Sequence, residues 1–240
     1  MIFTVKLADK LFQLECKYPE LKDFFKDYLV ETSVPDLSLS WTDEEILAEQ
    51  DPTSDCAFPV TYLETLAVLR KIAETLPHYN RLLIHGASIS YKDKGYLFSA
   101  PSGTGKSTHI RLWRKYLGED VGIINGDKPF VSLDNSEPHI FGTPWAGKEN
   151  WHKNCSLPLA GICFVKRGTT NTIRRLEPSD CLQLILKQVF IPSDPVSAGL
   201  TLELIDSLMK MVPVYLLECD ISEDAVRCSF EALTGLKYLK

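Results

Sequence analysis

The sequence predicts an α/β fold with a mixed β-sheet. Apolar segments of strand length alternate with longer segments whose apolar residues recur at helical spacing, the mixture that defines an α/β protein. Some neighbouring strand segments are joined by short turn signals such as Asp93-Lys94-Gly95, which indicate hairpins. Because hairpins join antiparallel strands, a mixed sheet is favoured over a strictly parallel one.

Residues 1–79 are expected to form an N-terminal α/β segment, to which the sequence assigns no role. Its expected elements are, in order, two strands over 2–16 around the turn Ala8-Asp9-Lys10, a short helix over 18–30 and a helix over 62–76. Residues 31–59 are polar, contain prolines and are weakly periodic, so loops or short edge strands are predicted there. Pro77 ends the last helix.

Residues 80–240 are expected to form a second domain. Its expected elements are two strands within 81–100, a helix over 106–117, a strand over 121–125, a hairpin over 129–142 around Asp134-Asn135-Ser136, strands over 160–166 and 213–218, and helices over 178–190 and 222–233. Pro178 and Ser179 are the start signal of the helix expected over 178–190.

The composition is that of an ordinary globular protein, with 45% hydrophobic and 24% charged residues. A net charge of −6 without a basic stripe argues against binding to nucleic acid or to an anionic membrane. The seven cysteines are scattered without a CxxC pair, so neither a disulfide framework nor a zinc site is expected. With no signal-peptide pattern and no apolar run of 18 residues, the chain is expected to be cytoplasmic.

The strongest motif is the string APSGTGKST at Ala100–Thr108, which separates a strand from a helix. The pattern is typical of a loop that binds the phosphates of a nucleoside triphosphate, although Ala100 replaces the usual first glycine. Two glycines allow the backbone to present successive N–H groups to a phosphate, and the positive end of the helix dipole faces the same phosphate. The predicted nucleotide-binding residues are Ser102, Gly103, Thr104, Gly105, Lys106, Ser107 and Thr108.

Such a site also needs a carboxylate near the loop, to hold a metal or to take a proton. Asp127 follows the strand predicted over 121–125 and fits this requirement. The alternative is a turn aspartate in the turn-rich string Asn-Gly-Asp-Lys-Pro. Lys106 is expected to reach the β- and γ-phosphates, and the Ser107 hydroxyl to ligate Mg²⁺.

The string HGASISYKDKGYLFSAPSGTGKST resembles the nucleotide-binding region of bacterial HPr kinase/phosphorylase and, more closely, of its short HPr-kinase-like relatives. That family has a His-Gly pair ahead of its loop at the separation of His85-Gly86, and the Ser-Gly step found at Ser102-Gly103. The resemblance covers residues 80–180. It implies a kinase fold similar to the HPr kinase C-terminal domain and the phosphoenolpyruvate carboxykinase core. HPr kinases assemble as hexamers, so the resemblance also suggests that this chain forms a homo-oligomer.

The family's Asp-Asp pair, which includes the catalytic base, corresponds here to Gly126-Asp127. The resemblance therefore implies a catalytic Asp127 but leaves open whether it takes a proton or holds the metal. His85 would contact the phosphates, as the matching family residue is thought to do, or be structural. The family's Glu-Ile-Arg-Gly signature is replaced by GTPWAGKENW, in which Glu149 could assist Mg²⁺ and Lys148 could neutralise phosphate charge. The alternative is a surface turn anchored by a tryptophan.

Three arginines flank a predicted turn after the strand over 160–166, namely Arg167, Arg174 and Arg175. One of them could stabilise charge on a transferred phosphoryl group, because arginine suits this role. The alternative is that they are exposed arginines of a hairpin.

The predicted function is an ATP-binding, Mg²⁺-dependent phosphotransferase that moves the γ-phosphoryl group to a hydroxyl of a protein, peptide or small molecule. The predicted catalytic residues are Asp127, Lys106 and His85, and the predicted metal ligands are Ser107, Asp127 and Glu149. Two alternatives stay open. The replacement at Gly126 suggests a nucleotide-binding regulatory or scaffold protein with little turnover, and the fold relationship alone suggests a carboxykinase-like lyase.

Overall fold

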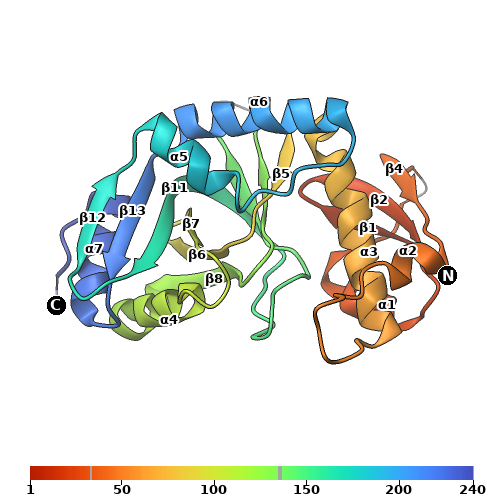
Figure 1. The fold of residues 1–240 in the computed structure, drawn as a ribbon, viewed down its shortest axis with the longest axis horizontal. Coiled ribbons are helices and arrows are strands. Elements are labelled where there is room, and N and C mark those ends of the chain that lie inside the picture. Colours follow the sequence, from red (N-terminus) through yellow and green to blue (C-terminus); the bar gives the residue numbers. More distant parts are fainter. Residues whose placement is uncertain (33, 135–136, 240) are drawn as a thin grey trace. The chain divides into compact units, whose positions relative to one another are not determined.

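The computed structural model describes residues 1–32, 34–134 and 137–239. The chain divides into two compact units, Met1–Leu76 and Pro77–Lys240, and each unit has its own β-sheet (Figure 1). Both sheets combine parallel with antiparallel strand pairs. The predicted α/β class with mixed sheets is therefore confirmed.

The first unit is a four-stranded sheet, with strand order β3-β1-β2-β4, and three helices. Its elements are β1 (Ile2–Leu7), β2 (Lys10–Glu15), α1 (Glu20–Phe24), β3 (Leu29–Val30), β4 (Leu37–Leu39), α2 (Asp43–Leu47) and α3 (Val60–Thr75). The predicted N-terminal hairpin turns at Ala8 and Asp9, both with positive φ. Positive φ at both central residues matches the right-handed twist of the two strands.

Two expectations for the first unit need correction. The helix expected over 18–30 ends at Phe24, and a 3₁₀ turn at Lys26–Tyr28 leads into β3. The region expected to hold only loops or edge strands also contains α2. This helix begins with a capping box, because Thr42 Oγ1 accepts from Glu45 N at 3.2 Å and Glu45 Oε2 accepts from Thr42 N at 2.9 Å.

The second unit carries a nine-stranded sheet with the order β5-β9-β10-β11-β7-β6-β8, to which β13 adds through β11 and β12 through β13. Its elements are β5 (Arg81–Leu83), β6 (Ala87–Tyr91), β7 (Lys94–Ser99), α4 (Lys106–Leu117), β8 (Val121–Asn125), β9 (Phe130–Ser132), β10 (His139–Phe141), β11 (Ser156–Arg167), β12 (Thr172–Arg175), α5 (Pro178–Ile185), α6 (Pro195–Met211), β13 (Val214–Cys219) and α7 (Glu223–Thr234). β11 pairs in parallel with β7 and β13.

Alternate residues of β7 and β11 point to opposite faces of this sheet. Tyr96, Phe98 and Cys163 belong to the apolar core beneath α4 and α7. Leu97 and Phe164 belong to the core beneath α5 and α6. The two helix pairs therefore cover opposite faces (Figure 1). β7 is buried on both sides, which gives the loop at its end a rigid base.

The second unit also departs from expectation in several places. The helix expected over 178–190 ends at Ile185, and α6 and β12 were not expected. The hairpin between β6 and β7 turns at Lys92 and Asp93, one residue earlier than predicted. β9 and β10 form the hairpin expected over 129–142, but Asn135 and Ser136 of its turn lie outside the described residues.

No helix in the described part of the chain combines the length and the apolar character needed to cross a membrane.

Candidate functional site

The loop between β7 and α4 has the bounds that the motif predicts, since β7 ends at Ser99 and α4 begins at Lys106. Gly103 and Gly105 have φ values of 73° and 121°, which residues with a side chain rarely adopt. A Cβ added at either glycine would meet no atom within 4 Å. The backbone conformation, rather than crowding by other residues, therefore requires glycine, and the space beside the loop is open to a ligand.

The side chain of Arg167, the last residue of β11, binds two backbone carbonyl groups of the loop. Its Nε donates to Thr104 O at 3.1 Å and its Nη2 donates to Gly103 O at 2.5 Å. Because a trans peptide points its C=O and N–H in opposite directions, this contact turns the N–H groups of Thr104 and Gly105 away from Arg167. Of the other two arginines, Arg174 pairs with Asp180 at 3.1 Å.

Lys106 lies buried at the base of the loop. Its Nζ donates to Ala100 O at 2.8 Å, so the ammonium group is held within the loop. Burial lowers the pKa of Lys106, the charge of Asp127 opposes this effect and the charge of Lys128 adds to it. Ala100 O occupies one of the three N–H donors of the ammonium group. A bound anion would favour the charged form of Lys106 and so oppose the effect of burial.

Asp127 and His85, predicted separately, lie in contact. His85 Nε2 is 3.2 Å from Asp127 Oδ1, and Lys128 Nζ is 3.8 Å from Asp127 Oδ2. Burial raises the pKa of the Asp127 carboxyl, but the hydrogen bond from His85 and the charges of Lys128 and Lys106 outweigh burial, so the pKa lies below its ordinary value. Asp127 is therefore ionised at neutral pH, as either a base or a metal ligand must be.

A buried amide holds the turn that carries Asp127. Asn125 Oδ1 accepts from Asp127 N at 2.8 Å and from Lys128 N at 2.7 Å. Asn125 Nδ2 donates to Thr143 O at 2.8 Å, and Thr143 Oγ1 donates to Lys128 O at 2.7 Å. Asn125 and Thr143 are both fully buried, so the carboxylate stands on a rigid turn. Sequence reasoning missed this support, although asparagine two residues before Asp127 is a turn signal.

His85 is fixed by a segment distant in the sequence. Its Nδ1 lies 3.0 Å from Gln188 Oε1, and its backbone N donates to Gln188 O at 2.7 Å. Ser99 Oγ donates to His85 O at 2.7 Å, which links this histidine to the last residue of β7. Gln188 was not predicted, because nothing local marks it.

Gly126 occupies a position with no room for a side chain. A Cβ added there would lie 2.5 Å from Ala146 O, a distance at which the backbone must move. Gly147, with φ of 73°, packs against Asp127, since its added Cβ would lie 3.1 Å from Asp127 Cβ. Gly126 is thus part of how residues 143–147 pack on this turn.

We expect Gly126→Asp to lower the free energy of unfolding by about 1–3 kcal/mol, the usual cost of overpacking a filled site. It should not raise any phosphotransfer activity, because the added carboxylate displaces the turn that carries Asp127. Chemical denaturation checks the first point. Gly126→Ala is the matched control, because a Cβ alone already collides with Ala146 O. A neutral Gly126→Ala would contradict the crowding argument.

One of the three predicted metal ligands, Glu149, is engaged in an ion pair. Glu149 Oε1 is paired with Arg111 Nη2 at 3.1 Å, and the Arg111 guanidinium lies over the Trp151 ring at 5.0 Å. Within the described ranges, no group of three or more His, Cys, Asp or Glu side chains could hold a metal ion. Mg²⁺ commonly uses one or two carboxylates together with phosphate oxygens, so Ser107 and Asp127 suit that mode. Glu149 has one of its two carboxylate oxygens in the ion pair with Arg111.

No protein-family model and no curated protein matches the chain. Among solved structures, the chain is similar to an HPr(Ser) kinase/phosphatase from Coxiella burnetii, with 12% sequence identity and a TM-score of 0.35. The match covers 64% of this chain and 99% of that chain.

Proposed function

We propose that this chain binds ATP with Mg²⁺ and transfers the γ-phosphoryl group to a hydroxyl of a protein, peptide or small molecule. The observation that carries the proposal is the combination of the loop at Ala100–Gly105 with Asp127. His85 connects the two, because its Nε2 lies 3.2 Å from Asp127 Oδ1 and its backbone O accepts from Ser99 Oγ, directly before the loop, at 2.7 Å. The sequence resemblance to HPr kinase points in the same direction, and the homo-oligomer it implies stays a prediction.

The residues present fit a triphosphate with its metal ion. The two glycines leave open space at the loop, and Arg167, which holds Thr104 O, turns the Gly105 N–H away from itself. The Thr104 N–H donates to Pro101 O within the loop. The N-terminus of α4 adds the positive end of its dipole. When bound, Mg²⁺ would neutralise charge on the β- and γ-oxygens, with the Ser107 hydroxyl as its protein ligand.

Each residue would then have a distinct task. Lys106, whose ammonium group has donors beyond the one that binds Ala100 O, would contact phosphate oxygens and stabilise charge on the transferred group. His85, held by Gln188, would keep Asp127 oriented through Oδ1. Asp127 Oδ2, whose contact with Lys128 is long at 3.8 Å, would accept the proton of the attacking hydroxyl. Asn125 would keep this carboxylate in place during the transfer.

We expect Lys106→Ala to weaken the binding of Mg²⁺-ATP by about 10- to 150-fold, because it removes a charge-assisted contact worth about 1.5–3 kcal/mol. Titration calorimetry measures the affinity. Lys115→Ala is the control, since Lys115 is an exposed lysine of the same helix beyond the loop. Equal affinity in wild type and Lys106→Ala would reject the loop as the phosphate site. A protein that binds ATP but never transfers phosphate to any acceptor would instead be a regulatory or scaffold protein.

A further inference from the structure

The two carboxylate oxygens of Asp127 have different neighbours. His85 Nε2 is 3.2 Å from Oδ1, whereas Lys128 Nζ is 3.8 Å from Oδ2. The first distance lies within the range of an N–H···O hydrogen bond, about 2.7–3.2 Å, and the second lies beyond it. Oδ2 and the ammonium group of Lys128 are therefore neighbours without a direct hydrogen bond.

The ammonium group of Lys128 has donors that no protein group uses. None of the hydrogen bonds formed within the described residues involves Lys128 Nζ, although an ammonium group has three N–H donors. The side chain is 30% exposed, so most of its length is packed against the protein while a ligand can still reach its end. Lys128 therefore offers a cation and free donors next to Asp127.

The backbone of Lys128 is held in place independently of its side chain. Its N–H donates to Asn125 Oδ1 at 2.7 Å and to Trp145 O at 3.2 Å, and its carbonyl accepts from Thr143 Oγ1 at 2.7 Å. Pro129 further restricts the backbone conformation of the residue before it. A change of the side chain at position 128 should therefore leave this turn intact.

One oxygen atom fits between Asp127 Oδ2 and Lys128 Nζ. A hydroxyl that donates to the carboxylate lies about 2.7 Å from Oδ2, and a hydrogen bond from the ammonium group measures about 2.9 Å. Because the two protein atoms are only 3.8 Å apart, a single hydroxyl oxygen can make both bonds at once. A hydroxyl has one proton and two lone pairs, so one lone pair remains to attack phosphorus.

A cation at this position also suits the charges that meet there. The carboxylate of Asp127 and an incoming triphosphate are both anionic and repel each other. Lys106 is held by Ala100 O at the base of the loop, whereas Lys128 lies directly beside the carboxylate. Lys128 therefore offsets the repulsion at the point where the acceptor oxygen and the phosphoryl group would meet.

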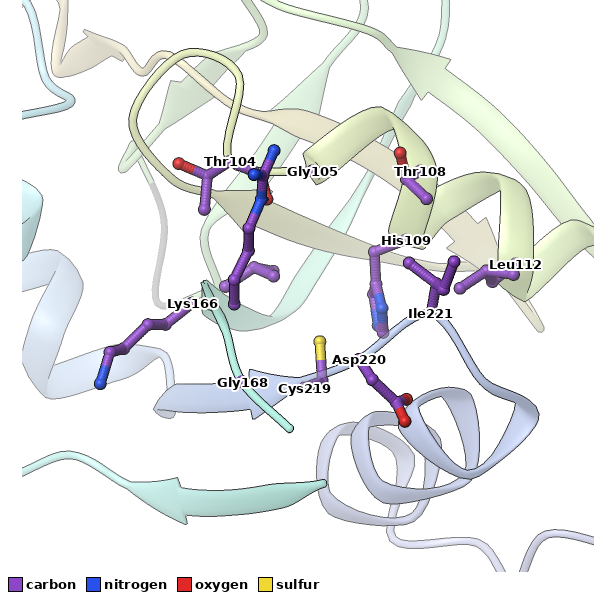
Figure 2. A pocket seen from close by; sticks show the side chains of 12 residues that line it. Thr104, Gly105, Thr108, His109, Leu112, Lys166, Gly168, Cys219, Asp220 and Ile221 are labelled. Carbon is purple, nitrogen blue, oxygen red and sulfur yellow. The ribbon is translucent and has the colours of Figure 1, made fainter. Parts of the chain in front are cut away.

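The cavity beside the phosphate loop does not provide this position. It has a volume of about 320 Å³, with Thr104 and Thr108 on one side and residues at the end of β13 on the other (Figure 2). Its described lining contains neither Asp127 nor Lys128. The acceptor oxygen would therefore be placed by the turn after β8 rather than by the walls of this cavity.

We propose, resting on the proposed function, that Lys128 is a catalytic residue that donates a hydrogen bond to the acceptor oxygen while Asp127 Oδ2 takes the hydroxyl proton. A bond forms between this oxygen and the γ-phosphorus, the bond from the γ-phosphorus to the bridging oxygen breaks, and its electron pair leaves with ADP. Lys128 keeps its proton, and its remaining donors contact the oxygens of the arriving phosphoryl group, which carry the charge. These contacts are absent from the complex with ATP alone.

The test compares an analogue of the transition state with an analogue of the substrate, both with Mg²⁺, by titration calorimetry. ADP with aluminium fluoride imitates the group in transfer, with water as the acceptor, and the β,γ-imido analogue of ATP imitates the substrate. Lys128→Met keeps most of the side-chain length without the charge. It should weaken the binding of ADP with aluminium fluoride about 10- to 100-fold, the loss of a charge-assisted hydrogen bond, and leave the imido analogue within about threefold.

Lys210→Met is the matched control, because Lys210 also pairs with a carboxylate, Asp206 Oδ2 at 2.5 Å, but lies on α6. Both of its affinities should equal those of wild type. Equal losses for the two analogues in Lys128→Met would make Lys128 a ligand of ATP, and no loss would leave it without a role. Either result overturns the inference and leaves the proposed function standing. A wild type that binds neither analogue, or whose ADP affinity aluminium fluoride does not raise, would overturn the proposed function and the role of Lys128 with it.

Discussion

Asp127→Asn should lower phosphotransfer by about 10²–10⁴-fold, the usual worth of a positioned proton acceptor, while the affinity for Mg²⁺-ATP stays within about threefold. An amide keeps the shape of the side chain and one acceptor oxygen, but it cannot take a proton at neutral pH. The turn should survive the change, because Asn125 holds it through the backbone N–H groups of Asp127 and Lys128. Affinity and turnover are measured together, with candidate acceptor peptides and metabolites.

The result also decides between the two roles of Asp127. A metal ligand would lose ATP affinity and turnover together, because Mg²⁺ bridges the phosphates before and during transfer. Asp120→Asn is the control, since Asp120 is an exposed carboxylate that directly precedes β8, whereas Asp127 follows it. Turnover that is equal in wild type and Asp127→Asn would remove Asp127 from the mechanism.

The parts of the site that were predictable are those that a local sequence pattern determines. The bounds of β7 and α4 follow from an apolar strand, a loop that requires positive φ at Gly103 and a helix that starts at Lys106. The hairpin between β6 and β7 is equally local, because Lys92 and Asp93 adopt positive φ within a two-residue turn. In both cases neighbouring residues favour the backbone conformation, and in the loop the distant Arg167 adds two hydrogen bonds to it.

The supporting contacts were not predictable, because they join segments far apart in the chain. His85 and Gln188 are 103 residues apart in the chain, and Asn125 contacts Thr143 across a connection that includes β9 and β10. Gly126 shows the limit most clearly. In the sequence it looks like a lost acidic residue, whereas its environment leaves no space for any Cβ.

α6 was missed for a different reason. Its apolar residues are spread around the helix, with Val196 and Leu202 exposed and Ile205 and Leu208 buried, so no single apolar stripe stands out. Its start signal was nevertheless present. Asp194 caps the helix by accepting from Ser197 N at 2.8 Å, and Pro195 occupies the first turn.

Gly103→Val should weaken the binding of Mg²⁺-ATP about 100-fold or more. Valine is penalised at φ of 73°, so the loop would move out of the conformation in which its N–H groups face the ligand. Losing two hydrogen bonds to an anion, each worth about 1.5–3 kcal/mol, accounts for an effect of this size. The added side chain would also enter the space beside the loop that is open to the phosphates.

Gly118→Val separates this loss of binding from general backbone strain. Gly118 follows α4 with φ of 70°, and a Cβ added there also meets nothing within 4 Å. Both variants should lower the free energy of unfolding by a similar amount, about 1–2 kcal/mol, the cost of a left-handed conformation. Only Gly103→Val should lose ATP affinity. If both variants bound ATP as wild type does while remaining folded, the backbone of the loop would not be the phosphate cradle. If both lost affinity equally, strain transmitted through α4 would explain the effect instead.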